Sequence, residues 1–296
     1  MKTLVAFYDL AVGPTSFDFV VFGVQAELER RRSGADRLHF VFVPDPKHYT
    51  RPKPAIYSQE EAVWRLHQIC LPACALLGAS FSLEPDRETI DVVGPKYRWP
   101  EDWDRQTLKN RHHLVGGVIR AAKAGERIPT LSASAFARKK VRDLFARIGL
   151  PIVTMTKRKT YLGGRNSDDS TWAAAARYIS ASGCYPWILE DTNVALTEGS
   201  GFGEINLDLR MAILQEADFN LQANNGAASL CWFSEKPYRM FGAGDEHWHG
   251  LFVEQGLPLG ESWPWARAQQ KLCYGKETLG SIIAEFDSWR KFRGLR

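Results

Sequence analysis

Several features that define whole classes of protein are missing from this sequence of 296 residues. It has no Gly-X-Y period and no sustained heptad repeat, and 45% of its residues are hydrophobic, which is more than a disordered chain carries. No window comes near 18 uninterrupted apolar residues, so we expect no transmembrane segment. A globular fold remains, and the chain is long enough for one large domain or two of ordinary size.

The sequence shows neither an excess of one charge nor an export signal. Its 38 Lys and Arg residues oppose 34 Asp and Glu residues and leave a net charge of +4. Proteins that bind nucleic acid usually cluster basic residues on one face, so nucleic acid is not expected as a partner. The first residues lack the apolar core and the cleavage site of a secretory signal, and we therefore expect a cytoplasmic protein.

Cysteine is scarce, with five residues that are odd in number and scattered along the chain. Cys70 and Cys74 are spaced as neighbours on one helix face, without zinc-knuckle spacing or a second ligand pair nearby. We therefore expect reduced thiols in the core. His247 and His249 alternate as they would on a strand but have no clear third ligand, so no metal site is expected.

Hydrophobic periodicity in the first part of the chain indicates alternating strands and helices. Apolar runs at 4–8 and 38–43 predict strands, and apolar residues at helical spacing over 17–28 predict a helix between them. This order is a β-α-β unit. A capping box at Ser58 predicts a further helix, and the Pro- and Trp-rich stretch that follows it predicts only one strand, near 90–93.

A second alternating series follows residue 130. In chain order we expect a helix at 132–148, a strand at 152–156, a helix from 166 to about 179, a strand at 187–189, a helix at 207–216, a strand at 219–223, a helix at 226–233, a strand at 238–241 and a last helix at 279–292. Such alternation predicts an α/β fold with two doubly wound Rossmann-like lobes and a cleft between them. We place the lobes at 1–148 and 149–275, and we expect the segment 276–296 to pack back on the first lobe.

The most informative turn follows the expected strand at 219–223. The strand breaks at Asn224-Asn225-Gly226, and a helix of small residues begins with Ala227. Free N–H groups at the start of a helix, at the carboxyl end of a strand, suit a phosphate. Gly226 lets a ligand approach the backbone, and both Asn side chains offer amides. A plain βα turn is the alternative, because Asn-Gly turns are common.

A second turn of this kind follows the strand that ends near residue 156. Its basic residues, and the amide and hydroxyl after them, are Lys157, Arg158, Lys159, Arg165, Asn166 and Ser167. Cations that face a helix N-terminus form an anion site, and a solvated basic loop is the alternative. Glu190 and Asp191 end the next strand, where acidic residues often bind a ribose hydroxyl. Simple capping of the following turn is the alternative for these two acids.

These blocks together resemble the donor lobe of GT-B glycosyltransferases, and most closely the heptosyltransferase-like group and uncharacterised bacterial glycosyltransferase-like proteins. The residues that carry the likeness are Arg165-Asn166-Ser167 with Trp172, Pro186 to Asp191, Leu209-Arg210-Met211-Ala212, Asn224-Asn225-Gly226 and Lys236 to Gly242. The resemblance implies an acceptor-side lobe at 1–148 and a nucleotide-sugar donor lobe at 149–275. It also implies that the sugar-nucleotide diphosphate binds between the two turns.

Catalytic roles follow from what a glycosyl transfer requires. A transfer with inversion needs a base for the acceptor proton, and cations or N–H dipoles for the leaving diphosphate. Asp9, at the end of the first strand, is the first candidate for the base, and Asp18 is the second, with helix capping as its alternative role. Arg158, Arg165 and Arg210 are candidates for the diphosphate, because a guanidinium pairs with two phosphate oxygens. A retaining mechanism needs no strong base, and the sequence does not distinguish the two.

The leading hypothesis is a metal-independent glycosyltransferase that moves a sugar from a nucleotide-sugar donor to a cell-envelope or polysaccharide acceptor. The nucleotide-sugar is a substrate, and no cofactor is expected. The acceptor would be a glycan or a lipid-linked saccharide, and peripheral association with a membrane stays open. Two alternatives remain: a non-catalytic nucleotide- or glycan-binding protein of GT-B type, and another α/β nucleotide-sugar enzyme such as an epimerase. The first strand lacks a following Gly-x-Gly-x-x-Gly turn, which argues against a dinucleotide oxidoreductase.

Overall fold

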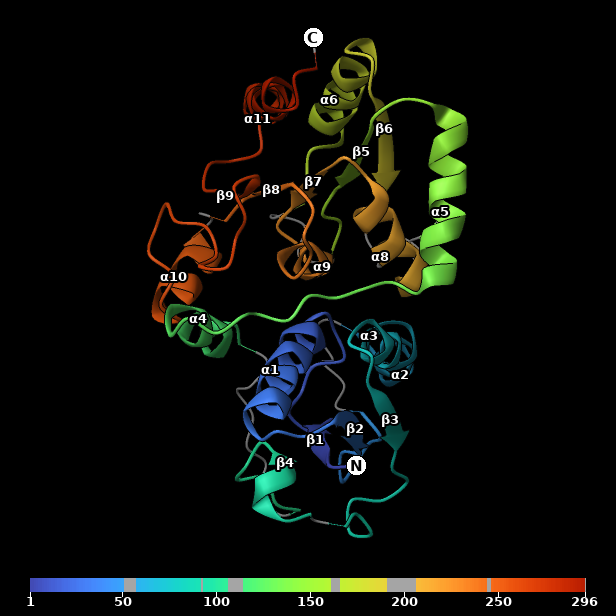
Figure 1. The fold of residues 1–296 in the computed structure, drawn as a ribbon, viewed down its shortest axis with the longest axis vertical. Coiled ribbons are helices and arrows are strands. Elements are labelled where there is room, and N and C mark those ends of the chain that lie inside the picture. The colour runs from blue at the N-terminus through green and yellow to red at the C-terminus, as the bar shows by residue number, and fades with distance from the viewer. Residues whose placement is uncertain are drawn as a thin grey trace. The chain divides into compact units, whose positions relative to one another are not determined.

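The computed structural model describes residues 1–50, 57–91, 93–105, 114–160, 166–190, 206–243 and 246–295. The chain divides into two units, Met1–Leu131 and Ser132–Arg296, each with its own sheet (Figure 1). The boundary therefore lies before the helix at 135–148, and not after it as the sequence suggested. The reason is local: the N–H of Ala133 donates to Gln215 at 2.8 Å and the N–H of Ser134 donates to Asp208 at 2.7 Å, both within the second unit.

Four parallel strands form the sheet of the first unit, in the order β3-β2-β1-β4. These strands are β1 (Thr3–Asp9), β2 (Arg37–Val43), β3 (Ser80–Leu83) and β4 (Arg98–Trp99). The described helices of this unit are α1 (Asp18–Arg32), α2 (Gln59–Arg65), the π-helical turn η1 (Leu66–Cys70), α3 (Leu71–Leu76), the 3-10 turn η2 (Pro95–Tyr97) and α4 (Gly116–Lys123). The predicted β-α-β opening is confirmed, and Ser58 caps α2 by accepting from the N–H of Glu61.

An aromatic layer joins the first sheet to α1. Tyr8 of β1 and Phe42 of β2 are register partners, so their side chains share one face of the sheet. Tyr8 packs edge-on against Phe19 and Phe22 of α1, with ring centroids 4.9 and 4.7 Å apart. All four rings are almost fully buried. This layer fixes the start of α1 close to the carboxyl end of β1.

Ile90 and Trp103 lie against the opposite face of the first sheet. Trp103 stacks on Phe7 with ring centroids 3.9 Å apart, and Ile90 is buried in the same cluster. The strand predicted at 90–93 is wrong for its described residues, because Ile90 packs on the sheet face and its carbonyl accepts from Arg105 Nε at 2.6 Å. The sequence did not predict β3 and β4, which are outer strands of four and two residues.

Five parallel strands form the sheet of the second unit, in the order β6-β5-β7-β8-β9. These strands are β5 (Ile152–Thr156), β6 (Tyr185–Leu189), β7 (Phe219–Ala223), β8 (Tyr238–Phe241) and β9 (Gln270–Cys273). The described helices are α5 (Ala135–Ile148), α6 (Asp169–Ala181), α8 (Leu207–Glu216), the 3-10 turn η4 (Gly226–Ala228), α9 (Ser229–Trp232), α10 (Glu246–Glu254) and α11 (Leu279–Phe292). Two separate parallel sheets with helices confirm the predicted α/β class, although β9 and α10 were not predicted.

Helices cover both faces of the second sheet. On one face, apolar side chains of β5 and β7 pack against α6 and α11 in a cluster that contains Trp172, Phe219 and Trp289. On the other face, Asn220 of β7 donates to a backbone carbonyl of α8, and Trp232 of α9 donates its indole N–H to a methionine sulfur of β8. The strands of this sheet are therefore buried on both sides, as a doubly wound sheet requires.

The C-terminal helix belongs to the core of the second unit. Trp289 of α11 stacks on Phe219 of β7 with ring centroids 4.8 Å apart, and the Tyr178 hydroxyl of α6 donates to Asp287 at 2.9 Å. The expectation that 276–296 packs back on the first lobe is corrected by these contacts. The apolar face of α11 was predicted correctly, but periodicity does not identify the surface that buries it.

The described residues show how the cysteines lie, how long the apolar helices are and whether metal-binding side chains form groups. All five cysteines are free and buried, as expected for core thiols. No helix in the described ranges is both long enough and apolar enough to cross a bilayer. The same ranges contain no group of three or more His, Cys, Asp or Glu residues placed to hold a metal ion. The side chains of His247 and His249 lie outside the described set.

Candidate functional site

The carboxyl edge of the second sheet contains the point where the strand order reverses. From β5 the chain passes through α6 to β6 on one side, and from β6 it passes through α8 to β7 on the other side of β5. The helix that follows β5 is α6, and the helix that follows β7 is α9. These two helices cover opposite faces of the sheet (Figure 1), so the loops after β5 and β7 leave this edge towards opposite faces. Open α/β sheets bind their ligands at such a reversal.

The turn after β7 is pinned to its neighbours by two asparagine amides. Asn225 donates to the carbonyl of Lys157 in the β5 loop at 3.1 Å, and Asn224 donates to the carbonyl of Gly242 after β8 at 3.1 Å. Both Asn residues are buried, whereas Gly226 is exposed. The side chains that the sequence suggested as ligand contacts thus hold the edge together and present Gly226 to solvent.

The helix predicted at 226–233 forms as a 3-10 turn followed by one short α-helical segment, of three and four residues. Asn225 caps it, because its Oδ1 accepts from the N–H of Ala228 at 3.0 Å. Because the helix is so short, its macrodipole is small. Anion binding at this turn would therefore depend on individual backbone N–H groups. The N–H groups of Gly226 and Ala227 precede the first hydrogen bond of the turn, and of these two residues Gly226 is the exposed one.

The loop after β5 brings Arg158 and Ser167 to the same place. The N–H of Arg158 donates to the Ser167 hydroxyl at 2.9 Å, and the N–H of Ser167 donates to the Arg158 carbonyl at 3.0 Å. The Arg158 guanidinium donates to the carbonyl of Asn224, which connects the β5 and β7 turns. Asn166 braces the loop, since its amide donates to the Thr160 carbonyl at 3.0 Å and accepts from the Thr160 N–H at 2.8 Å.

Glu190, Lys157 and Arg210 form the part of the site next to β6. Arg210 of α8 is 1% exposed and donates to the carbonyl of Glu190 at 2.9 Å, so it supports the end of β6. The Glu190 carboxylate pairs with Lys157 at 3.3 Å, and Lys157 also pairs with Asp169 at 2.8 Å. Burial lowers the pKa of Lys157, but these two carboxylates outweigh it, and the net shift is upward. Lys157 therefore stays charged beside Glu190.

Two residues assigned to the donor from the sequence, Arg165 and Asp191, lie outside the described residues. Their roles stay predictions. The hydrogen bonds given above join the described donor residues Arg158, Ser167, Asn224 and Asn225 across the β5 and β7 turns. Gly226 and Ala227 follow directly in the β7 turn.

A carboxylate that the sequence did not indicate lies in this region. Glu277 precedes Thr278, the N-cap of α11, and is half-buried. Burial raises the pKa of Glu277, while the nearby Ser167 hydroxyl, Trp172 indole and Arg158 guanidinium oppose that rise. An acid before an N-cap threonine signals only a helix start. The packing of α11 beside α6 is what brings Glu277 to the site.

In the first unit, Asp9 ends β1 as predicted but is engaged in a buried ion pair. Both of its carboxylate oxygens accept from the Arg87 guanidinium, one of them from Nη1 at 2.8 Å, and Oδ1 also accepts from the N–H of Ala11 at 3.1 Å. Arg87 donates as well to the carbonyls of Pro44 and Arg105, at 3.2 and 3.3 Å. Asp9 is thus the counter-ion of an arginine that joins three segments of the first unit.

Asp18, the other candidate base, is exposed at the first turn of α1. Its carboxylate accepts from the Ser16 hydroxyl at 2.7 Å. The N-cap residue is Phe17, which forms no side-chain cap, so the carboxylate of Asp18 does not serve as the N-cap acceptor. Of the two carboxylates predicted at this edge, Asp18 is the one that solvent and a substrate can reach.

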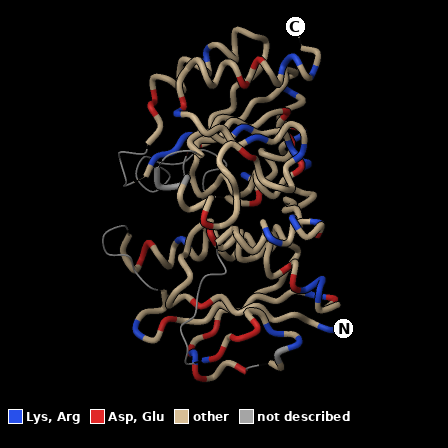
Figure 2. Tube along the Cα trace, turned by 90° about the vertical axis from the view of Figure 1, so that its left-hand side faces the viewer, with Lys and Arg blue, Asp and Glu red and all other residues tan. Residues whose placement is uncertain are grey.

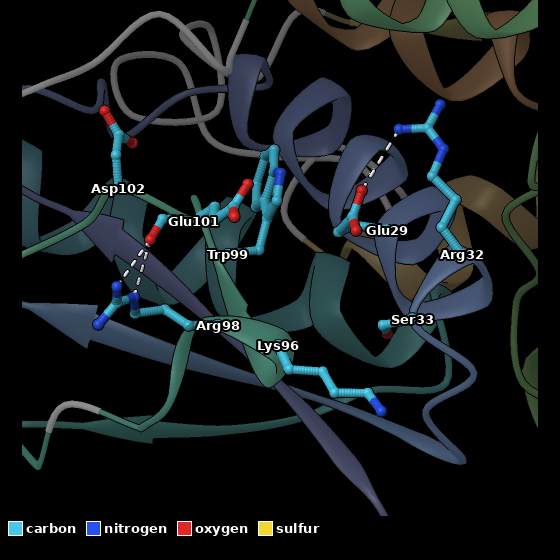
Figure 3. A pocket seen from close by; sticks show the side chains of 8 residues that line it. All are labelled: Glu29, Arg32, Ser33, Lys96, Arg98, Trp99, Glu101 and Asp102. Carbon is cyan, nitrogen blue, oxygen red and sulfur yellow. Dashed lines mark hydrogen bonds and ion pairs between the residues drawn. The ribbon is translucent and has the colours of Figure 1, made fainter.

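A separate hollow of about 840 Å³ lies in the first unit, beside β4 and the C-terminal end of α1 (Figure 3). Its lining carries both signs of charge. Arg98 donates to the carbonyl of Glu101 at 2.8 Å, and Arg32 pairs with Glu29 at 3.3 Å. Its arginines are therefore held by oxygens of the protein, and the hollow shows no bias towards an anion.

Two separate parallel sheets in one chain, each flanked by helices, match the architecture of two-lobed glycosyltransferases. Comparison with solved structures agrees with this architecture. The chain has the GT-B fold of heptosyltransferase-like enzymes. The fold that the sequence resemblance implied is confirmed. No protein-family model matches the chain, and a search of curated proteins finds no match.

Three solved structures illustrate this likeness. A glycosyl transferase family 9 protein from Veillonella parvula DSM 2008 is 8% identical with a TM-score of 0.51, over 97% of both chains. The iron-containing dodecameric glycosyltransferase TibC from enterotoxigenic E. coli is 13% identical with a TM-score of 0.52, over 99% of this chain and 77% of its own. The E. coli ADP-heptose LPS heptosyltransferase II is 11% identical with a TM-score of 0.50, over 99% of this chain and 100% of its own.

Proposed function

We propose that this protein is a glycosyltransferase that moves a sugar from a nucleotide-sugar donor to a cell-envelope or polysaccharide acceptor. The observation that carries the proposal is the meeting of the Arg158 loop and the Gly226 turn at the reversal point of the second sheet, in a chain with the fold of glycosyltransferases. A guanidinium and backbone N–H groups at a strand-to-helix turn together suit a diphosphate.

In this proposal the donor diphosphate lies against the N–H groups of Gly226 and Ala227, beside Arg158. We assign Glu190, which follows β6, to a ribose hydroxyl of the donor, because acids at that position bind ribose in doubly wound sheets. Arg210 acts indirectly, because it is buried and holds the carbonyl of Glu190. Arg165 and Asp191 are assigned to the donor on the sequence resemblance.

The first donor to test comes from the structural neighbours. TibC has been solved in complex with ADP-D-beta-D-heptose, and the E. coli relative is named an ADP-heptose LPS heptosyltransferase. We therefore propose an ADP-linked heptose as the first donor and a lipid-linked or envelope saccharide as the acceptor.

For the chemical step we assign the base to Asp18. Its carboxylate takes the proton of the acceptor hydroxyl while the acceptor oxygen bonds to the anomeric carbon of the donor. The bond from that carbon to the diphosphate oxygen breaks, and the leaving diphosphate keeps the electron pair beside Arg158 and the N–H groups of the β7 turn. We further propose that this step needs no metal and no cofactor. Transfer should therefore persist in EDTA.

Calorimetry with ADP and ADP-heptose tests the donor site, with Gly226→Val as the perturbation. Gly226 has the right-handed backbone of a 3-10 turn, so valine adds bulk at an exposed position without backbone strain. Losing one or two hydrogen bonds to a charged ligand should weaken binding by about 10- to 100-fold. Gly94→Val is the matched control, because Gly94 is exposed, has no atom within 4 Å of an added Cβ and lies in the other unit.

Equal affinities of Gly226→Val and wild type would show that the diphosphate binds elsewhere. Tight nucleotide binding, with neither transfer to lipid-linked saccharides nor release of ADP, would favour the non-catalytic alternative instead.

A further inference from the structure

Helix α5, on the surface of the second unit, carries an unusual concentration of positive charge. Its 14 residues contain five Arg or Lys and one Asp, so its formal charge equals the net +4 of the whole chain. Figure 2 shows that both units carry basic and acidic residues along the described trace. A helix with this composition attracts an anionic surface.

The inner and outer faces of α5 differ clearly. Ala137, Val141 and Phe145 are buried, and they recur at intervals of four residues along the face towards the sheet and α8. Three of the five cations are paired with acids: Arg138 and Arg142 with Glu216, and Lys139 with Asp143. The other two, Lys140 and Arg147, are exposed on the outer face. No acid of the described ranges is within salt-bridge distance of either, but Asp143 lies between them along the helix, and after Lys139 both cations help to lower its pKa.

Apolar side chains lie at both ends of this charged row. Phe136, at the start of the helix, is 71% exposed, and Lys140 lies 5.4 Å from its ring centroid. Leu150, just after the helix, is 46% exposed. Tyr185 is 40% exposed and adjoins this end, because its N–H donates to the carbonyl of Pro151 at 2.8 Å. At 1.5 Å per residue the two apolar ends are about 20 Å apart.

We propose that the outer face of α5 docks on an anionic lipid bilayer. Lys140 and Arg147 would contact headgroup phosphates, and Phe136 and Leu150 would insert at the boundary with the acyl chains. A nucleic acid or an acidic protein would pair with the cations but would leave the exposed apolar residues at both ends of the basic row without a partner. A lipid bilayer matches both features, because its surface is charged and its interior is apolar. The purpose of this surface rests on the proposed function, because a lipid-linked acceptor requires the enzyme to work at a membrane.

Co-sedimentation with vesicles tests the docking surface without any sugar nucleotide. The full chain is mixed with vesicles of phosphatidylcholine alone, or with 30 mol% phosphatidylglycerol. The wild type should bind the anionic vesicles, and binding should fall steeply in 0.5 M salt. Each basic residue near an anionic surface changes the partition about fivefold, so Lys140→Glu/Arg147→Glu should weaken it at least about 25-fold. Phe136→Ser should weaken it about tenfold or more.

Lys47→Glu/Lys96→Glu is the matched control, because it makes the same charge change at exposed positions of the first unit. It should leave vesicle binding within about threefold of wild type. An equal loss in the control would show that net charge, and not α5, drives binding. If Phe136→Ser left vesicle binding unchanged and the wild type bound DNA as tightly as vesicles, α5 would be a general polyanion-binding surface. That result would overturn the proposal.

Calorimetry with ADP on the same variants separates the two proposals. Unchanged nucleotide affinity together with lost vesicle binding supports the docking surface. A wild type that binds ADP but not anionic vesicles would overturn the docking surface alone. A wild type that binds the vesicles but neither ADP nor ADP-heptose would overturn the proposed function alone.

Discussion

Replacing Asp9 and Asp18 by Asn, one at a time, separates a structural carboxylate from a catalytic one. The side chains of Asp9 and Arg87 are only 5% and 6% exposed. Asn retains the shape of Asp but cannot balance the guanidinium, so Asp9→Asn leaves a buried charge without its partner. Breaking a buried pair in this way costs about 3–5 kcal/mol, a large part of the roughly 5–15 kcal/mol that stabilises a typical domain.

This magnitude can be measured by urea unfolding followed by circular dichroism. A loss of about 4 kcal/mol, divided by a dependence of about 2 kcal/mol per molar urea, lowers the midpoint of the first unit by about 2 M. The double variant Asp9→Leu/Arg87→Met should recover most of the loss, because apolar residues of similar size often replace a buried pair at little cost. At low urea, folded Asp9→Asn should keep its turnover within about threefold of wild type, a change under roughly 0.7 kcal/mol.

Asp18→Asn should show the opposite pattern. Asp18 is exposed in the first turn of α1, where an acid contributes less than about 1 kcal/mol, so the urea midpoint should move little. If Asp18 takes the acceptor proton, turnover should fall by about 100- to 10,000-fold with nearly unchanged nucleotide affinity. An Asp18→Asn variant with turnover within threefold of wild type, or a stable but inactive Asp9→Asn variant, would refute the assignment.

Two further expectations concern the core of the second unit. Trp289→Ala should cost about 3–5 kcal/mol and lower the melting temperature, because Trp289 is fully buried and stacks on Phe219; an unchanged melting temperature would mean that α11 does not complete this core. Burial raises the pKa of the Cys231 and Cys273 thiols to about 12. Since all five cysteines are buried, Ellman's reagent at pH 8 should find no fast-reacting thiol in the folded protein and five in guanidinium, and rapid labelling of the native chain would contradict this.

Local signals in the sequence determined most of the elements that position the candidate site. The apolar pattern predicted β5, β7 and α8 with the bounds that the structure shows, and Gly149 and Gly183 marked the ends of α5 and α6, because hydrophobic period and capping act over a single turn or strand. The turn at Asn224–Gly226 was identified for the same reason. Strand β4 was missed because two residues show no period, and the expected strand at 90–93 was wrong because apolar residues also recur where a loop packs on a sheet.

Only the tertiary structure decided which residues meet across long separations. Asp9 and Arg87 are 78 residues apart, and no spacing in the sequence shows that they form a buried pair, which leaves Asp18 as the accessible carboxylate. Glu277 lies near Ser167 because α11 packs beside α6. The amphipathic pattern of α11 required some apolar partner, but several sheet faces would have satisfied it. Hydrophobic burial is non-directional. The sequence therefore determined which faces are buried, and the packing of the whole chain determined which surface each face packs against.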